Sequence, residues 1–511
     1  MRGPHNLFRL VRAGSTFERT GAMNYALEKL EAPLSIRIAL RIIGWPFKLL
    51  GIKGEPDLPP VARALTALGP AYIKLGQNLS TRPDIVGDEF SNELQILLDR
   101  LPPFSDEEAK RTIRKELGQD VDELFSEFSP PVAAASVAQV HRARVRSSGR
   151  EVAVKILRPG IERVIRRDID AFYFTARFIE FFLPATRRLH PTDVIRYFEN
   201  IILAEIDLRL EASAVAEHFA NTSGDKGFSV PSLVWELSAR RVMTLDWVDG
   251  IPLTDPEALR KQGVDFDDLA RRIVQSFLRH ALRDGFFHAD LHPGNLMVVP
   301  DGSLLALDYG ITGRIDDYTR RVYAEILFGF IRRDYDRVAR VHFEAGYVPR
   351  GQDINAFSQA LRSVGEPIFG QDATRISMGR LLRHLFDVTE RFGMETRTEL
   401  LLLQKTMVVV EGVARSLNPN LNIWETAKPV VEQYIKDNVG PKAIVRDAAR
   451  TLEILSRFGP RVPMIIEEGL NRERDGPQQS QAPRSNAETA ITWFSIGVIA
   501  VVLVLLLADL I

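Results

Sequence analysis

The chain has 511 residues, enough for several domains and a sizeable hydrophobic core. Its 66 Lys and Arg residues nearly balance its 67 Asp and Glu residues, so no overall basic charge indicates a nucleic-acid partner. Apolar residues make up 45% and charged residues 26%, a globular composition that excludes disordered and collagen-like chains. Cys is absent, which excludes disulfides, Cys-ligated metals and thiol nucleophiles and fits a reducing compartment.

The first 54 residues combine basic and apolar side chains. They hold nine Lys or Arg against three Asp or Glu. This pattern is typical of an amphipathic helix on anionic headgroups, and equally of a solvated helix docked on a domain. Arg9, Arg12 and Glu18 interrupt any apolar run of a signal peptide, so we expect the body of the protein to stay in the cytosol.

Residues 131–158 predict a β-hairpin. Two alternating runs flank the polar turn Ser147-Ser148-Gly149. Lys155 lies late in the second run, and in the protein-kinase pattern V-A-I-K this lysine holds the α and β phosphates of ATP. Motifs of four residues also match by chance, so this one needs support from other segments.

Two further segments follow in the order of a kinase. A helix is predicted over 199–220, and its Glu211 is the candidate partner that orients Lys155. Residues 241–253 resemble a strand that leads into a hinge, where backbone groups could meet adenine.

The segments GFFHADLHPGNLMV (285–298) and SLLALDYG (303–310) carry the strongest signal. Asp290 and Asn295 have the five-residue spacing of the catalytic loop H-R-D-x-x-x-x-N, and Asp308 begins a D-Y-G in the place of D-F-G. Phosphoryl transfer needs Mg²⁺ on hard oxygen ligands, so Asn295 and Asp308 are predicted to hold it. Asp290 is predicted to orient the attacking hydroxyl or water.

His288 and His292 flank Asp290, and a transition-metal site is the alternative interpretation of this pair. On a loop, however, histidines four residues apart lack the shared face that a helix would provide. We therefore expect both to brace the catalytic loop through hydrogen bonds.

The chain departs from ordinary protein kinases at two places. Residues 133–139 replace the Gly-rich loop with AAASVAQ, and each added Cβ restricts the backbone and its approach to phosphate. After Asp308 a helix is predicted over 316–333, without an A-P-E motif or a long activation segment. A platform for a peptide substrate is therefore not expected. The pattern stays helical to about residue 469.

The C-terminal region predicts a membrane anchor. Residues 489–508 are 20 consecutive uncharged residues, which as a helix at about 1.5 Å per residue span a hydrocarbon core of about 30 Å. The polar segment 471–488 favours a detached span over a buried core helix. Arg472, Arg474 and Arg484 precede the span, so the positive-inside rule places the preceding domains in the cytoplasm.

A K-x-G-Q motif, Lys74-Leu75-Gly76-Gln77, precedes the kinase-like segments, and ordinary kinases lack it. With this motif the chain resembles the UbiB (ADCK) family of protein-kinase-like proteins over almost its whole length. The other family motifs match the Ala-rich loop 133–139, with Ala138 in the place of a Gly, the E-x-D motif Glu205-Ile206-Asp207, and the ion-pair glutamate Glu211.

The resemblance implies an α+β, atypical protein-kinase-like fold with two lobes, an N-terminal helical extension over the active site and a C-terminal transmembrane helix. In the family, the K-x-G-Q segment occupies the place of a protein substrate and is held by the E-x-D motif. The expected domains are an N-terminal extension (1–115), an N-lobe (116–250), a C-lobe (251–470), a linker (471–488) and an anchor (489–511).

The resemblance further implies a Mg²⁺-dependent ATPase or atypical kinase at the cytoplasmic face of the inner membrane, supporting ubiquinone biosynthesis. Its partners would be membrane lipids, polyprenyl-phenol intermediates and other proteins of that biosynthesis, and no nucleic acid. Direct hydroxylation is not expected, because no G-x-G-x-x-G fingerprint opens a βαβ unit. A small-molecule phosphotransferase and a non-catalytic pseudokinase scaffold that binds nucleotide and lipid are the alternatives.

The candidate site residues fall into four groups. They are Asp290, Lys155 and Glu211 for catalysis; Val132, Ala133, Ala134, Ala135, Ser136, Val137, Ala138, Gln139, Val140 and Lys155 for ATP; Asn295 and Asp308 for Mg²⁺; and Lys74, Gly76, Gln77, Glu205 and Asp207 for regulation.

Overall fold

The structure is a computed structural model. It describes residues 5–29, 50–80, 93–94, 96–97, 103–182, 191–349, 351–370, 384–385, 388–389, 391–394, 398–440 and 449. The chain divides into two compact units, Met1–Asn438 and Val439–Ile511, and every helix and strand given below lies in the first. The predicted linker and membrane anchor lie outside the described residues. Among the described helices, none is both long and apolar enough for a membrane span.

A four-stranded antiparallel sheet carries Lys155. Its strand order is β1-β2-β3-β5, with β1 at Phe125–Ala134, β2 at Ala138–Val145, β3 at Glu151–Leu157 and β5 at Val242–Asp246. The β2–β3 pairing confirms the predicted hairpin, and β5 confirms the strand before the hinge. Because side chains alternate along β3, Val154 and Ile156 are fully buried on one face while Lys155 points to the other.

Helix α8 (Asp106–Leu117) covers the buried face of this sheet. Ser105 caps the helix by accepting a hydrogen bond from the backbone N–H of Glu108. Ala109 and Ile113 of α8 share an apolar cluster with Val152 and Val154. The short helix α9 (Val121–Leu124) then leads directly into β1.

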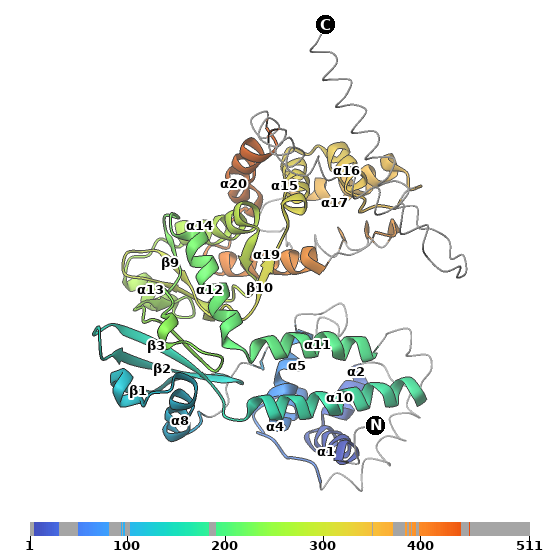
Figure 1. Ribbon diagram of the computed structural model, residues 1–511. Coiled ribbons are helices and arrows are strands. Elements are labelled where there is room, and N and C mark those ends of the chain that lie inside the picture. The colour runs from blue at the N-terminus through green and yellow to red at the C-terminus, as the bar shows by residue number, and fades with distance from the viewer. Residues whose placement is uncertain are drawn as a thin grey trace, which may run out of the picture. The chain divides into compact units, whose positions relative to one another are not determined.

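The N-terminal helices pack beside two long helices that follow strand β3 in the chain. Helices α10 and α11 run side by side, with α1, α4 and α5 on the same part of the molecule (Figure 1). One apolar cluster, called here the extension cluster, joins α5, α10 and α11 to the sheet; it contains Ala71, Val137, Ala138, Leu157, Ile161, Ile165, Ile169, Phe172, Phe198, Ile202, Ile206, Leu208, Ala212 and Met243. The helices are α1 (His5–Thr20), α2 (Ala22–Lys29), α4 (Pro60–Leu68), α5 (Pro70–Ser80), α10 (Ile161–Phe182) and α11 (Pro191–Glu205).

The prediction of one continuous helix over 199–220 is wrong. The chain instead forms α11, which ends at Glu205, and α12 (Leu208–Thr222). Asp207 causes the break: its backbone is extended, with φ −125° and ψ 91°, and its side chain accepts a hydrogen bond from the N–H of Arg209. A carboxylate that caps a helix N-terminus starts a new helix in this way.

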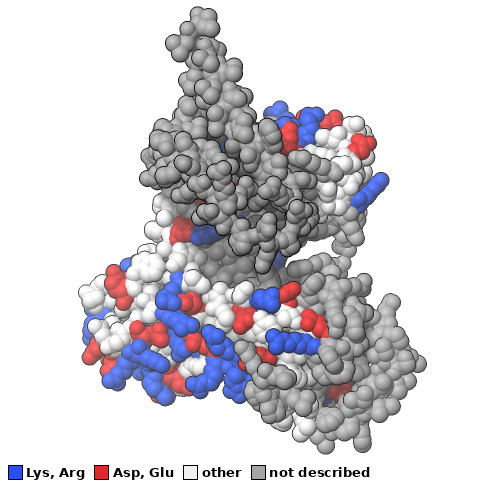
Figure 2. Space-filling view, turned by 45° about the vertical axis from the view of Figure 1, so that its right-hand side comes forward, with Lys and Arg blue, Asp and Glu red and all other residues white. Residues whose placement is uncertain are grey.

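The C-terminal part of the described chain, to residue 438, is mostly helical, as predicted, and also contains two small sheets. Asp316 caps α15 through the N–H of Thr319, at the start of the predicted 316–333 helix. Acidic and basic side chains are interspersed on the described surface visible in Figure 2. The helices are α13 (Pro256–Lys261), α14 (Phe266–Arg279), α15 (Asp317–Arg332), α16 (Tyr335–Glu344), α17 (Ile354–Gly370), α19 (Thr398–Leu417) and α20 (Ile423–Asn438). The strands are β4 (Phe228–Ser229), β6 (Ile251–Pro252), β8 (Leu296–Val298) and β9 (Leu304–Ala306) in one sheet, and β7 (Phe286–His288) with β10 (Thr312–Arg314) in another.

Candidate active site

Lys155 lies between two carboxylates from distant segments. Its Nζ donates to Glu211 Oε1 and Oε2, at 2.7 and 2.9 Å, and to Asp308 Oδ1 at 3.3 Å. Glu211 projects from the first turn of α12, directly after the cap that Asp207 provides. The structure thus brings together three residues that the sequence motifs predicted to share one site.

The charges of Lys155, Glu211 and Asp308 shift one another's pKa values. Burial alone would lower the pKa of Lys155, but Asp308 and Glu211 together hold it above its ordinary value. Lys155, and to a smaller extent Lys74, hold the pKa of Asp308 below its ordinary value. Burial raises the pKa of Glu211 to about 7, against the opposing pull of Lys155. At neutral pH, Lys155 and Asp308 are therefore both charged.

Two histidines brace the catalytic loop, as predicted. His288 Nδ1 accepts the N–H of Asp290 at 3.1 Å, so its Nε2 carries the proton and donates to the Leu307 carbonyl at 2.8 Å. Burial lowers the pKa of His288, which keeps the ring neutral. His292 Nδ1 accepts the N–H of Gly294 at 3.0 Å. Both rings thus fix the backbone on either side of Asp290.

Asp290 and Asn295 occupy opposite ends of this loop. Asn295 is buried in the short helix η5 (Pro293–Asn295), and its Nδ2 donates to the Asp290 carbonyl at 3.0 Å. The Asp290 side chain is 43% exposed, so its carboxylate is open to an incoming acceptor group. The loop is thus tied at its backbone while its reactive side chain stays accessible.

Asn295 and Asp308, the residues predicted to hold Mg²⁺, each keep an oxygen atom that is chemically suited to that role. With Nδ2 used in the loop, the Asn295 amide oxygen is the atom left to coordinate. Asp308 has a left-handed φ of 53°, and its Oδ1 accepts from Lys155 Nζ and from the N–H of Gly310. Among the described residues, no group of three His, Asp or Glu could hold a metal alone. Mg²⁺ commonly takes one or two protein ligands, with phosphates and water supplying the rest.

The K-x-G-Q helix reaches this site through Lys74. Its Nζ lies 3.1 Å from Glu205 Oε2, and the two side chains are only 17% and 11% exposed. Asp207 acts elsewhere: it caps α12 and pairs with Arg209 at 2.6 Å. The two acids of the E-x-D motif thus have separate contacts, one to α5 and one to α12.

Gly76 and Gln77 both lie against Leu97. A Cβ on Gly76 would lie 2.3 Å from Leu97 Cδ1 and 2.7 Å from Leu65 Cδ1, so a larger residue here would force these two buried side chains to move. Gln77 Nε2 donates to the Leu97 carbonyl at 2.8 Å. These two residues of the motif therefore act on packing within the N-terminal helices.

The Ala-rich loop divides into an accessible and a buried half. Val132 and Ala133 are exposed, whereas Ser136, Val137, Ala138 and Gln139 are buried, and Val140 pairs with Lys155 across β2 and β3. Gln139 Oε1 accepts the N–H of Phe104 at 2.9 Å, so its amide anchors the chain ahead of α8. Ala134 and Ala135 lie at the boundary, half-buried. Nucleotide contacts of the whole loop remain a prediction.

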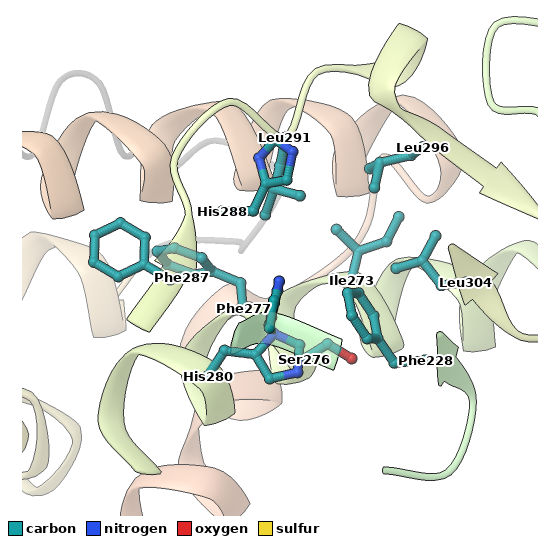
Figure 3. A pocket seen from close by; sticks show the side chains of 11 residues that line it. Phe228, Ile273, Ser276, Phe277, His280, Phe287, His288, Leu291, Leu296 and Leu304 are labelled. Atoms are coloured by element: carbon teal, nitrogen blue, oxygen red, sulfur yellow. The ribbon is translucent and has the colours of Figure 1, made fainter. Parts of the chain in front are cut away.

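Two contacts and a cavity near the site had not been predicted. Arg158 donates to the Ala135 carbonyl, and Thr406 Oγ1 of α19 lies 3.3 Å from the Ala289 carbonyl, next to Asp290. A third feature is a small cavity behind the catalytic loop, where His288 and Leu291 face His280 and Ser276 among apolar side chains (Figure 3). Lys155 and Asp308 do not line this cavity, so it is separate from the candidate nucleotide site.

Comparison with known proteins identifies the family. Residues 96–342 match the ABC1 atypical kinase-like domain, and residues 361–422 match the UbiB helical domain. A "Probable protein kinase UbiB" of Marinobacter nauticus is 40% identical over 82% of this chain and 77% of its own length. The chain belongs to the UbiB family. A Pseudomonas paraeruginosa member with the same description is 39% identical over 91% of this chain and 90% of its own.

The UbiB assignment agrees with the fold and with the prediction of a kinase-like enzyme. A solved complex of a Mycobacterium tuberculosis protein with erythromycin covers 70% of this chain and 90% of its own, with a TM-score of 0.50 and 23% identity. At this identity the likeness supports the fold alone. The family match makes the chain an atypical kinase-like protein, and its kinase-like domain implies ATP binding.

Proposed function

We propose that this protein is an ATPase or atypical kinase that uses Mg²⁺ and ATP to support ubiquinone biosynthesis at the cytoplasmic face of the inner membrane. It acts on, or mobilises, polyprenyl-phenol intermediates. The observation that carries the catalytic part is the placement of Lys155 between Glu211 and Asp308. The membrane part rests on the uncharged segment 489–508 and on the family.

The residues of the site have complementary tasks in this proposal. Lys155, fixed by two bonds to Glu211, supports the α and β phosphates of ATP. Asp290 accepts a hydrogen bond from the attacking hydroxyl or water and aims its oxygen at the γ phosphate. His288 keeps the Asp290 backbone in place, and its neutral ring makes this support independent of pH near neutrality.

Asn295 and Asp308 supply the oxygen atoms for Mg²⁺. An ion held by these two residues would stabilise the negative charge of the phosphates during phosphoryl transfer. The lowered pKa of Asp308 keeps its carboxylate charged, as a ligand of a hard cation must be. A scaffold that only binds nucleotide has no need of Asp290 together with both oxygen ligands.

The test is phosphate release and phosphotransfer from ATP by the full chain in detergent, with and without Mg²⁺. Asp308→Asn should reduce turnover by about two orders of magnitude or more, because one oxygen ligand and its charge are lost. Asp301→Asn is the matched control, because Asp301 is exposed and accepts the N–H of Ser303 in a surface turn. Unchanged turnover in Asp308→Asn would refute the metal assignment.

Addition of anionic vesicles and a phenolic ligand to the same assay tests the role at the membrane. We expect both to raise turnover of the full chain and to leave Asp308→Asn inactive. Nucleotide that stabilises the fold without any Mg²⁺-dependent turnover would support the scaffold alternative instead.

A further inference from the structure

The buried half of the Ala-rich loop has an unfavourable polar group. Ser136 is fully buried, and its hydroxyl has no hydrogen-bond partner among the residues that the structure describes. Burial of an unsatisfied hydroxyl costs about 1–3 kcal/mol. Contacts elsewhere must therefore hold the loop in this conformation.

Arg158, three residues after Lys155, makes those contacts. Its Nε and Nη2 donate to the Ala135 carbonyl at 3.2 and 3.1 Å, and its backbone N–H donates to the Val137 carbonyl at 2.8 Å. The carbonyls on both sides of Ser136 are thus tied to one residue. The guanidinium also lies 5.8 Å from the centre of the Phe104 ring.

The loop is held from the other side by apolar packing. Val137 is only 8% exposed and belongs to the extension cluster, which also contains Ala71 and has Leu75 packed against it. Ala71 and Leu75 lie on α5, on either side of the position that carries Lys74. In this conformation both Ser136 and Val137 are buried, so the Ser136 hydroxyl is not accessible from solvent.

We propose that Arg158 is a positioning residue that locks the tip of the Ala-rich loop in the core and withholds Ser136 from the bound nucleotide. This inference rests on the proposed nucleotide site. A nucleotide that recruits the loop must first break the bonds between Arg158 and Ala135. A variant without these bonds needs less free energy to release the loop, so it binds nucleotide more tightly.

The test measures the Kd of the full chain for Mg²⁺-ATP in detergent. Arg158→Met keeps the aliphatic stem and removes the donors, and we expect its Kd to be about 3- to 10-fold lower than that of the wild type. Arg158→Lys retains one charged donor and should give an intermediate Kd. Arg144→Met is the matched control, because Arg144 of β2 pairs with Glu127 and Glu151, away from the loop.

Hydrogen exchange separates a lock from general destabilisation. In Arg158→Met without nucleotide, the amides of residues 135–137 should exchange faster while those of β2 and β3 stay unchanged. Faster exchange throughout the sheet would contradict a positioning role. A Kd equal to or higher than that of the wild type would also overturn the proposal.

Ser136→Ala tests the same lock without touching Arg158. It removes the buried unsatisfied hydroxyl, so the melting temperature should rise and the Kd for Mg²⁺-ATP should increase about 3- to 10-fold. A Kd unchanged from the wild type would overturn the proposal even if Arg158→Met does not fold. If the wild type itself binds no nucleotide, the proposed function fails; if it binds but these variants match it, only the lock fails.

Discussion

Lys74 and Glu205 show how one ion pair can connect two motifs. Both side chains are largely buried, so each depends on the other for its charge to be tolerated. Glu205 ends α11, and two residues later Asp207 caps α12, the helix that carries Glu211. A change at Lys74 therefore acts on Glu205, which lies only a short stretch of chain before Glu211 of the Lys155–Glu211 pair.

Gly76 gives the sharpest prediction for a single residue. In Gly76→Ala, the new Cβ meets methyl groups of Leu97 and Leu65, so we expect a loss of about 1–3 kcal/mol in unfolding free energy. Chemical denaturation of the full chain measures this loss. Gly412→Ala in α19 is the matched control, because nothing lies within 4 Å of its Cβ position and Ala favours a helix by about 1 kcal/mol. Equal effects of the two changes would refute the packing argument.

At the scale of elements, α16 contains a buried histidine that makes packing depend on pH. His342 contacts Phe357 of α17 edge to face, with ring centres 5.3 Å apart, and its Nδ1 is bonded to the Val338 carbonyl. Burial lowers its pKa from 6.5 to about 4. Between these two pH values the unfolded chain binds a proton that the folded chain does not, so stability falls as the pH drops from 6.5 towards 4.

We expect His342 to account for up to about 3 kcal/mol of stability lost between pH 7 and pH 4. The measurement is the unfolding free energy of the wild type and of His342→Phe at several pH values in this range. The variant should lack that part of the pH dependence. Identical pH profiles for the two proteins would show that His342 does not titrate in this way.

Some elements were predictable because local chemistry decides them. The β2–β3 hairpin follows from alternation around a Ser-Ser-Gly turn, and α15 from an Asp cap ahead of a helical pattern. The break between α11 and α12 was missed, because the apolar pattern continues through it and only the Asp207 cap divides the helix. The order of motifs predicted the group around Lys155, but Arg158 and Thr406 act through backbone carbonyls, which no side-chain pattern reveals.

For the whole molecule, the extension cluster makes α5 of the N-terminal helices part of the kinase-like core. Deletion of residues 1–80 would remove Ala71 of this cluster together with Leu75, which packs against it, and leave apolar surface of the remaining cluster exposed. We expect the shortened chain to melt at a lower temperature and to bind a hydrophobic dye. Thermal unfolding and dye fluorescence measure both effects.

Deletion of residues 476–511 is the comparison for this truncation. It removes part of the predicted linker and the predicted anchor, and should leave the melting temperature of the remaining chain unchanged. Equal melting temperatures for the two truncated proteins and the full chain would show that α5 contributes nothing to the core.

The reach of these contacts along the chain also bears on how the protein folds as it leaves the ribosome. Helix α5 is synthesised before the sheet that it packs with. Asp308 follows Lys155 by 153 residues, so this contact forms only after that length of chain has been synthesised. Contacts so distant in sequence raise the contact order and slow folding. The apolar face of α5 therefore stays uncovered until α10 and α11 have been synthesised, and we expect the nascent chain to be open to chaperone binding over that interval.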